Sequence, residues 1–429
     1  LLILRVFKTF PVSNREKLHQ QMLNWANRFN ICCFLANHNY SSVLNFQEIL
    51  LGAGSIKKLP FSEDSDLETI NSFIDSQKDW VFFHLSFESL SILKKEIPLA
   101  SDKTGFLPLT FFVPQYVIKF RSDNIEIGSL EMDHEDVFHQ LIQESVTDSV
   151  NRKSVNTIPA ISRETYLEKI NGLLAHIQRG DCYEINFCQE FFSEHAVIDP
   201  LQTWRTLCTI SPNPFSVFYK SESAYLLSAS PERFLCKKGE KLISQPMKGT
   251  IRRDPENPQR DAALRHSLQH SQKDQMENVM VVDLVRNDLS RVCQEGTVKV
   301  SELFGIYAYP QVYQMISTIE GKVKKNISFM DIMDACFPMG SMTGAPKHRV
   351  LDLIRVFENG PRGLFSGSVG YITPEGDFDM NVVIRSILYN AATNYLSFMS
   401  GSGITALSNP ENEYEECLLK GSAIRKVLS

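Results

Sequence analysis

Hydrophobic residues recur with helical spacing in the middle of the chain, directly after a polar segment. They fall at i, i+4, i+8 and i+11: Tyr166, Ile170, Leu174 and Ile177. This spacing places them on one face of an α-helix. Ser162 stands where a helix N-cap belongs, and Gly180 stands where a left-handed C-cap belongs. The pattern therefore predicts a helix between these two residues.

The spacing changes from helical to alternating after this helix. Tyr183, Ile185 and Phe187 alternate with polar residues, which is typical of a β-strand. Because successive side chains of a strand point to opposite faces, Glu184 and Asn186 share the other face.

Other segments repeat both patterns along the chain. Residues 241–245 form a further strand pattern. A helix is expected from Pro410, burying one set of residues: Tyr414, Cys417, Gly421, Ile424 and Leu428. The mixture predicts an α/β or α+β architecture with large sheets.

The 429-residue length allows two or three domains or one large fold. The polar stretch 145–159 ends in a proline and is interpreted as a linker. We expect an N-terminal region over 1–155 and a second region over 156–429, which holds nearly every chemistry-bearing motif.

Composition excludes several classes of protein. A net charge of −6 and a pI near 6.0 argue against a nucleic-acid binder. No apolar run approaches the roughly 18 residues that span a bilayer. Nine scattered cysteines without a Cys-x-x-Cys pair are typical of reduced thiols. We therefore expect a cytoplasmic protein that binds neither nucleic acid nor membrane.

A glycine-rich segment over 337–360 resembles a phosphate-binding loop but lacks its spacing. Gly340 and Gly344 are too close together, and Pro346 removes a backbone donor. A helix then follows, and helix N-termini favour anions. A carboxylate-binding turn and a purely structural turn both remain open.

Two acidic pairs stand at i, i+3 spacing on expected helices. They are Asp274 with Glu277, and Glu413 with Glu416. Facing each other, the pairs could hold Mg²⁺, which binds a few carboxylates and keeps several waters. Either pair alone could equally be a solvated helix face.

Lys248 lies between the strand 241–245 and Gly249, in the stretch QPMKGT. A lysine amine becomes a nucleophile only when neutral, which requires a buried or cation-flanked setting. A surface lysine is the alternative interpretation. Glu232 and Arg385 carry no distinctive local signal by themselves.

Six segments, taken together and in order, resemble the chorismate-utilising enzyme family. They are SASPERF, QPMKGT, ENVMVVDLVRNDLSRVC, FPMGSMTGAPKHRV, SGSVGYITPEGDFDMNVVIRS and GSGITALSNPENEYEECLLK, within residues 161–429. The resemblance implies an anthranilate-synthase-like α/β sandwich with two large antiparallel sheets flanked by helices. The N-terminal region looks shortened relative to anthranilate synthase.

The resemblance also implies roles for individual residues. Glu277 and Glu416 would ligate Mg²⁺ directly, and Asp274 and Glu413 would hold its waters. Glu232 would act as the general acid. The remaining residues would line the chorismate site: Thr343, Gly344, Tyr371, Arg385, Gly403 and Lys420.

Lys248 distinguishes members of this family. The resemblance implies that aminodeoxychorismate synthases carry a nucleophilic lysine here, whereas anthranilate synthases usually carry alanine. The expected product is 4-amino-4-deoxychorismate, the precursor of 4-aminobenzoate and folate. Water-adding members carry a lysine where Glu184 stands, and the aminating members commonly carry glutamine there. Gln314 stands where a histidine is usual.

The resemblance implies that ammonia comes from a separate glutamine amidotransferase subunit, or from ammonium in solution. The sequence itself holds no Gly-x-Cys-x-Gly nucleophile motif. Two alternatives remain. An anthranilate synthase large subunit would aminate C2 of chorismate, and a non-catalytic chorismate-binding homologue would have lost its metal site.

Overall fold

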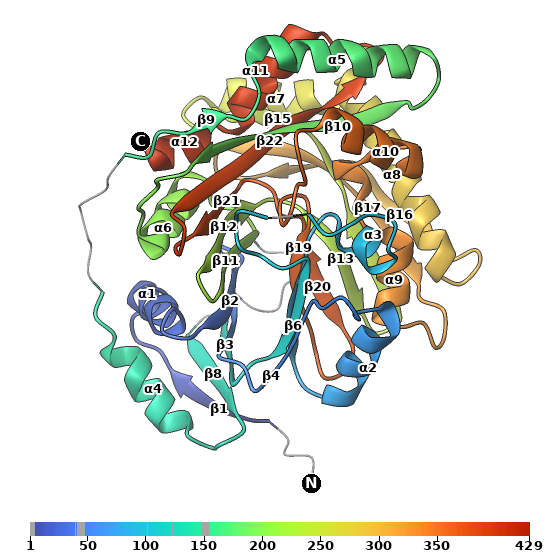
Figure 1. Cartoon of the computed structure of the whole chain (residues 1–429). Coiled ribbons are helices and arrows are strands. Elements are labelled where there is room, and N and C mark those ends of the chain that lie inside the picture. Colours follow the sequence, from blue (N-terminus) through green and yellow to red (C-terminus); the bar gives the residue numbers. More distant parts are fainter. Residues whose placement is uncertain (1–4, 39, 41–47, 101, 122, 147–153) are drawn as a thin grey trace.

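The fold consists of two antiparallel sheets packed face to face, with helices on the outer surfaces (Figure 1). The computed structural model describes residues 5–38, 40, 48–100, 102–121, 123–146 and 154–429. This arrangement confirms the anthranilate-synthase-like sandwich expected from the sequence.

Sheet A has twelve strands within the described residues. Eleven of them lie in the order β1 (Val6–Pro11), β8 (Asn124–Ser129), β7 (Tyr116–Arg121), β3 (Ile49–Ala53), β2 (Ile31–Ala36), β11 (Phe215–Ser221), β12 (Ala224–Ser230), β21 (Ser386–Asn390), β22 (Tyr395–Thr405), β10 (Glu184–Ser193) and β18 (Gly344–Ala345), and β9 (Ile158–Pro159) also pairs with β10.

Sheet B has ten strands within the same described ranges. Nine of them lie in the order β15 (Met247–Arg252), β17 (Val312–Lys322), β14 (Lys241–Gln245), β13 (Arg233–Lys238), β20 (Phe378–Asn381), β19 (Ser368–Ile372), β5 (Val81–Leu85), β6 (Leu109–Val113) and β4 (Lys57–Pro60), and β16 (Lys299–Ala308) pairs with β17.

Helices cover both sheets. They are α1 (Arg15–Ala26), α2 (Leu67–Gln77), α3 (Ser89–Leu93), α4 (His134–Gln143), α5 (Arg163–Gln178), α6 (Pro200–Ile210), α7 (Pro258–Gln269), α8 (Gln272–Val292), α9 (Phe329–Cys336), α10 (Lys347–Phe357), α11 (Pro410–Lys420) and α12 (Ser422–Leu428), with a 3₁₀ turn at Gly340–Met342. No helix of the described residues is long and apolar enough to cross a membrane.

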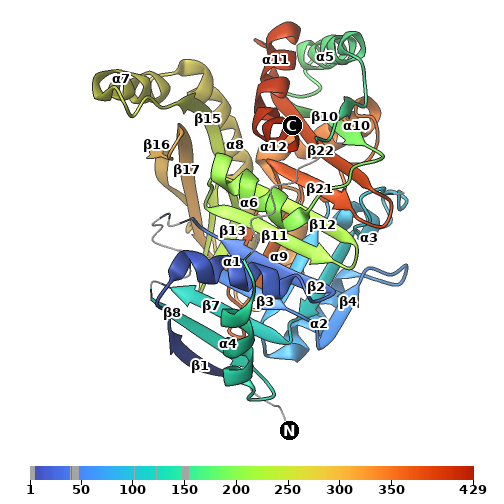
Figure 2. The same ribbon diagram turned by 90° about the vertical axis from the view of Figure 1, so that its left-hand side faces the viewer.

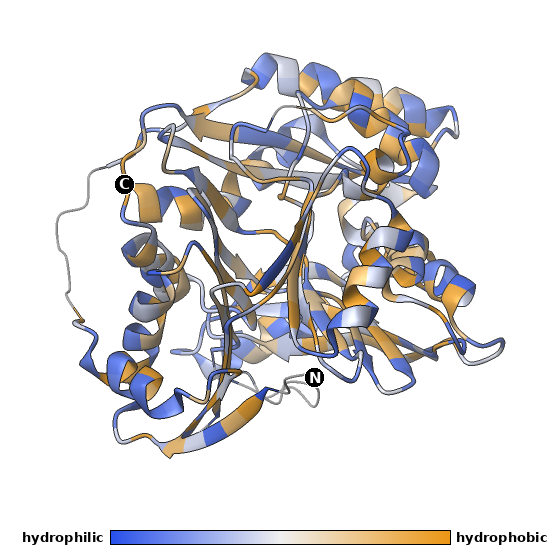
Figure 3. Cartoon of the chain, turned by 60° about the horizontal axis from the view of Figure 1, so that its bottom comes forward, coloured by the Kyte–Doolittle hydropathy of each residue, from blue (hydrophilic) through white to orange (hydrophobic). Residues whose placement is uncertain are grey.

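Strand β2 shows why some strands are apolar on both faces. Cys33 points into the core between the sheets, whereas Cys32 and Phe34 point into the core beneath the outer helices. Because alternate side chains point to opposite faces, a strand covered on both sides needs apolar residues at every position. Figure 3 shows hydrophobic residues along the strands and mixed polarity on the helices.

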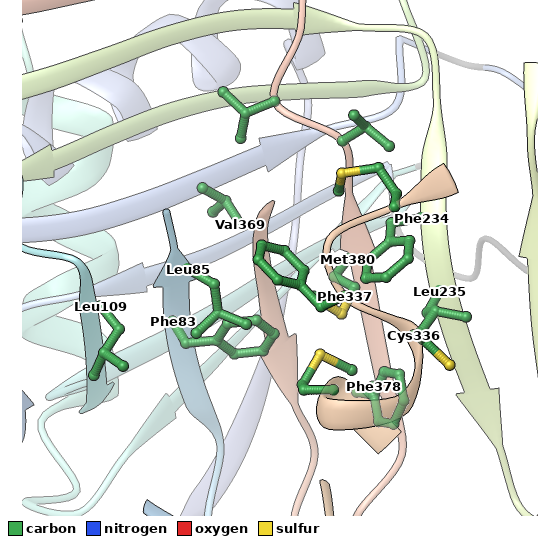
Figure 4. Packing of buried hydrophobic residues seen from close by; sticks show 14 of the residues in the cluster. Phe83, Leu85, Leu109, Phe234, Leu235, Cys336, Phe337, Val369, Phe378 and Met380 are labelled. Atoms are coloured by element: carbon green, nitrogen blue, oxygen red, sulfur yellow. The ribbon is translucent and has the colours of Figure 1, made fainter. Parts of the chain in front are cut away.

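The core between the sheets also contacts α8 and α9. Phe83 and Val369 come from sheet B, and Phe337 follows α9. Figure 4 shows these side chains packed together beside Met380. This packing fixes the position of the loop after α9, which leads to Gly340 and Thr343.

Strands from both sides of residue 155 build each sheet. In sheet A, β2 pairs with β11, and in sheet B, β5 pairs with β19. The two expected regions therefore contribute to the same two layers. Of the expected linker, residues 147–153 lie outside the described residues.

Several local predictions are confirmed. Helix α5 begins after Ser162, whose side chain accepts a hydrogen bond from the Thr165 N–H, and Gly180 has a φ of +82°. The strand over 241–245 is β14. The single helix expected from Pro410 to Leu428 is wrong, because the structure has two helices that meet at Gly421. A Cβ at Gly421 would lie 3.1 Å from the Phe398 ring, so this residue permits a close approach to β22.

Candidate active site

Lys248 lies where the ends of the two sheets meet. It follows β14, as expected, and belongs to the next strand, β15. Its side chain is 11% exposed, and Nζ donates to Oε1 of Glu184 on β10 at 2.5 Å. Oε2 of Glu277 on α8 is 4.0 Å from the same nitrogen. Lys248 is therefore a buried amine, not a surface lysine.

Two effects act on the pKa of Lys248 in opposite directions. Burial disfavours the charged amine, but the carboxylates of Glu184 and Glu277 outweigh burial and raise the pKa of Lys248 above its ordinary value. The amine is therefore held as an ammonium ion in this structure, and it must lose a proton before it can attack carbon.

Two glycines allow the chain to approach this pair closely. A Cβ at Gly403 on β22 would lie 3.1 Å from both Glu184 Oε1 and Lys248 Nζ. Gly344 has a φ of +141°, and a Cβ there would lie 2.0 Å from the Glu184 carbonyl oxygen. Both positions were predicted to line the site, and both lie directly against Glu184.

Thr343 is fully buried beside β10. Its hydroxyl donates to the Met339 carbonyl at 3.1 Å, and its own carbonyl accepts from the Asn186 N–H at 2.7 Å. The Arg362 guanidinium connects this loop to β10, because it donates to the Met342 carbonyl at 2.6 Å and to the Asn186 carbonyl at 2.8 Å. Hydrogen bonds thus hold the glycine-rich turn against β10, the strand that carries Glu184.

Glu232 follows β12 and has an environment suited to a proton donor. Burial raises its pKa to about 7, although the Ser341 hydroxyl and the charge of Lys248 act in the opposite direction. A carboxylic acid with a pKa near the working pH is well matched to proton transfer. Its carbonyl accepts from the Val382 N–H at 3.0 Å, which ties it to the segment that leads to Arg385.

This pKa shift predicts a pH-dependent stability. The pKa of Glu232 is higher in the folded state than in the unfolded state. Its contribution to the free energy of unfolding is therefore fully present below pH 4.5 and is lost as pH rises through about 7. Relative to Glu232→Gln, the wild type should lose about 3 kcal/mol of unfolding free energy across this window. Urea unfolding of both proteins at pH 5 and pH 8 measures it. An equal difference between the two proteins at both pH values would contradict the assignment.

The two acidic pairs lie on the helices expected for them, Asp274 and Glu277 on α8 and Glu413 and Glu416 on α11. Burial raises the pKa of Glu277, and the charge of Glu416 adds to this shift. Burial also acts to raise the pKa of Glu416. The Lys420 ammonium, whose Nζ lies 2.7 Å from Glu416 Oε1, outweighs burial, so the pKa of Glu416 is lowered.

The donor chemistry of these helices fits Mg²⁺. Every candidate donor is a carboxylate oxygen, and Glu413 is 2% exposed with its Oε2 lacking a hydrogen-bond partner within the described chain. Throughout the described ranges, no three acidic, histidine or cysteine residues form a ready-made ligand cluster. Mg²⁺ binds through one or two carboxylates with waters, so a pre-closed cluster is not required.

Arg385 lies in the segment between β20 and β21, which connects the two sheets. Its carbonyl accepts from the Ala229 N–H at 3.1 Å. Burial lowers the pKa of Arg385, and no carboxylate opposes this effect. Arg385 is half-buried, and no ion pair is formed by its guanidinium within the described residues, so it is suited to a carboxylate ligand.

Tyr371 lies apart from this cluster, on β19. Its ring packs against Trp80 with centroids 5.6 Å apart, and it lines a cavity with Leu35 and Asp379. No described contact joins it to Lys248 or Arg385. The structure therefore does not bring Tyr371 to the site that the resemblance implied.

Several residues that stabilise the surroundings of the site were not identified from the sequence. Lys347, which follows the glycine-rich turn, donates to Asp288 on α8 at 2.6 Å and to the Cys336 carbonyl at 2.9 Å. Glu358 and Arg362 form a buried ion pair at 2.6 Å. Glu358 and Arg362 are i, i+4 neighbours, a spacing that could have identified them, whereas Lys347 and Asp288 are far apart in sequence.

Residues 41–426 match the family of chorismate binding enzymes. The chain is 40% identical over 281 residues to the chloroplastic aminodeoxychorismate synthase of Arabidopsis thaliana, covering 65% of this chain and 30% of that protein. It is 37% identical over 268 residues to aminodeoxychorismate synthase component 1 of Escherichia coli (strain K12), covering 62% and 58%. The chain thus spans less than two thirds of these curated relatives.

Solved structures confirm the fold. Anthranilate synthase component I from Streptococcus pneumoniae TIGR4 superposes with a TM-score of 0.80 at 22% identity, covering 90% of this chain and 93% of that one. The menaquinone-specific isochorismate synthase from Escherichia coli superposes with a TM-score of 0.77 at 15% identity, covering 99% and 94%. The family match extends over most of the sequence, and the chain therefore belongs to the chorismate-binding enzymes.

Proposed function

We propose that this chain aminates chorismate at C4, giving 4-amino-4-deoxychorismate for 4-aminobenzoate and folate synthesis. The observation that carries the proposal is the buried amine of Lys248, held among Glu184, Glu232 and Glu277. The curated relatives named aminodeoxychorismate synthase support the same reaction.

Substrate binding is assigned to Arg385, to the residues next to Glu184 and to Lys420. Chorismate has two carboxylates, and the guanidinium of Arg385 can bind the enolpyruvyl carboxylate through two parallel hydrogen bonds. Thr343, Gly344 and Gly403 would form the wall of the site next to Glu184. Lys420 donates to the Gly401 carbonyl at 3.1 Å, which places a cation at the end of α11.

Lys248 and Glu232 would carry out the first step. The protonated Glu232 gives its proton to the hydroxyl that leaves C4, forming water. The resulting carboxylate takes a proton from the Lys248 ammonium, and the freed amine lone pair bonds to C2. When ionised, Glu232 is near enough for its charge to contribute to raising the pKa of Lys248.

Ammonia would complete the reaction. Its lone pair bonds to C4 as the C2–N bond to Lys248 breaks, and the electron pair of that bond returns to the lysine nitrogen. The product carries the new nitrogen as an ammonium group, and the lysine is regenerated as a free amine.

Mg²⁺ would be held by Glu277 and Glu416, with Asp274 and Glu413 holding its waters. When bound, the ion would offset the negative charge of the ring carboxylate. Ammonia would come from a glutamine amidotransferase partner, as the name component 1 of the bacterial relatives suggests.

A product assay tests the proposed function. The protein is incubated with chorismate, Mg²⁺ and ammonium, with and without an added aminodeoxychorismate lyase. We expect 4-aminobenzoate only when the lyase is present. Anthranilate formed without lyase would mean amination at C2, and unchanged chorismate would mean that the chain is not an aminating enzyme.

A further inference from the structure

Three buried serines of the family motifs have no part in the proposed chemistry. Ser228 and Ser230 belong to the motif SASPERF, and Ser386 ends the motif that contains VVIRS. Each is at most 1% exposed. Strand alternation places them on the same faces as Leu226 and Leu388, which pack in the core between the sheets. A hydroxyl in such a core needs a hydrogen-bond partner, so the partners of these serines indicate what they do.

All three hydroxyls lie against carbonyls of the segment that crosses from β20 to β21. Ser230 Oγ donates to the Val382 carbonyl at 2.6 Å. Ser386 Oγ lies 2.7 Å from the Ile384 carbonyl oxygen, and Ser228 Oγ lies 3.4 Å from the same oxygen. The Ser386 and Ser228 hydroxyls are themselves 2.9 Å apart. These three residues, the serine cluster, therefore supply hydrogen bonds to two carbonyls of the crossing segment.

The crossing segment has an unusual backbone at Arg385. The φ of this residue is +53°, in the left-handed region that residues with a side chain rarely adopt. Such a conformation persists only where the surrounding contacts determine it. The Ala229 N–H donates to the Arg385 carbonyl at 3.1 Å, and the serine cluster holds the peptide that precedes Arg385. Because φ sets the direction in which a side chain leaves the backbone, these contacts determine where the guanidinium lies.

Ser230 also contacts the residue proposed as the general acid. Its Oγ accepts from the Glu232 N–H at 3.3 Å, and the Glu232 carbonyl accepts from the Val382 N–H at 3.0 Å. A change at Ser230 would therefore affect Glu232 as well as the crossing segment. The described contacts of the Ser386 hydroxyl are with Ile384 and Ser228, so Ser386 reports on the crossing segment alone.

We propose that the serine cluster positions Arg385 to bind the enolpyruvyl carboxylate of chorismate, with Ser386 as its central positioning residue. This inference rests on the proposed function and adds residues that act through Arg385 without touching the substrate. When the Ile384 carbonyl loses its donor, the backbone at Arg385 can relax from the left-handed region, and the guanidinium moves with it. The ring carboxylate of chorismate, assigned to the Mg²⁺ side of the site, is bound as before.

Ser386→Ala tests the proposal, because alanine removes only the hydroxyl. Binding is measured by isothermal titration calorimetry with Mg²⁺ and without ammonium. Two ligands are compared: chorismate, and trans-3,4-dihydroxycyclohexa-1,5-diene-1-carboxylate, which keeps the ring carboxylate but lacks the enolpyruvyl group. The Kd for chorismate should rise about fivefold to tenfold, as is typical for one lost hydrogen bond. The Kd for the diene carboxylate should stay unchanged.

Ser216→Ala is the matched control. Ser216 is also fully buried in sheet A, but its hydroxyl donates at 2.9 Å to the Asn213 carbonyl, which is not part of the crossing segment. This variant should bind both ligands as the wild type does. In an Arg385→Gln background, Ser386→Ala should cause no further change in either Kd, because the serine cluster acts through Arg385.

Circular dichroism and a thermal melt show whether Ser386→Ala is folded. If it is not, Ser228→Ala takes its place with the same expected result, since Ser228 contacts the same carbonyl from β12.

An unchanged Kd for chorismate in the folded variant would overturn the proposal. So would an equal rise in Kd for both ligands, or a further rise in the Arg385→Gln background, because either would mean that the serines support the site as a whole. The binding measurement needs no turnover. If the wild type binds chorismate but forms no aminated product, the proposed function fails while this inference stands.

Discussion

Replacing Lys248 with methionine should abolish the proposed covalent adduct with chorismate and lower ammonia-dependent turnover by about 10³-fold or more, as for loss of a nucleophile that acts together with its neighbours. Methionine keeps most of the length and apolar character of the lysine stem but has no nitrogen. The adduct is measured by intact-protein mass spectrometry with chorismate and without ammonium, and turnover by the lyase-coupled assay.

The fold should tolerate this change, because methionine packs readily in irregular spaces. The loss of the amine leaves Glu184 without its 2.5 Å partner, so circular dichroism and a thermal melt should accompany the assay. Lys241→Met is a suitable control, since Lys241 lies on β14, which β17 separates from β15, and its side chain is 52% exposed. An adduct of unchanged yield in Lys248→Met would assign the nucleophile to another residue.

Glu416→Gln should remove nearly all Mg²⁺-dependent turnover while the protein remains folded. The amide has one carbonyl oxygen and no negative charge, so it is a far weaker ligand for Mg²⁺ than the carboxylate. The variant also loses the ion pair with Lys420, but both side chains are more than a third exposed, and such pairs contribute less than about 1 kcal/mol. Turnover is measured as a function of Mg²⁺ concentration.

Glu415→Gln provides the control for the same helix, because Glu415 is the adjacent exposed acid on α11. It should bind Mg²⁺ and turn over as the wild type does. Full activity of Glu416→Gln at the Mg²⁺ concentration that half-saturates the wild type would rule out Glu416 as a metal ligand.

The arrangement of the helices explains why a shared site for the two acidic pairs was harder to predict than the helices that carry them. Figure 2 shows α7 and the ends of β15 and β17 on one side of the molecule, and α5 and α11 on the other. The sequence placed each acidic pair on a helix correctly, because i, i+3 spacing is local. How α8 and α11 face each other depends on the packing of both sheets, which local spacing does not report.

Tyr371 and Gly421 show where pattern-based expectation fails. Tyr371 stands in a motif shared with the family, yet β19 turns its ring toward Trp80. Gly421 continues the apolar stripe of a helix, yet the chain divides there into α11 and α12. The orientation of β19 decides where the Tyr371 ring points, and the close contact with Phe398 accompanies the division at Gly421. Both depend on distant parts of the chain.

The sequence by itself determined the elements with strong local signals and the family. The Ser162 cap and the Gly180 terminus delimit α5, and the alternation at β10 places Glu184 and Asn186 on one face, because caps and side-chain periodicity act within a few residues. Only the tertiary structure decided which side chains meet. Glu184 and Lys248 are 64 residues apart, and their contact follows from the meeting of two sheets, since sheet register and core packing, unlike local propensity, connect distant segments.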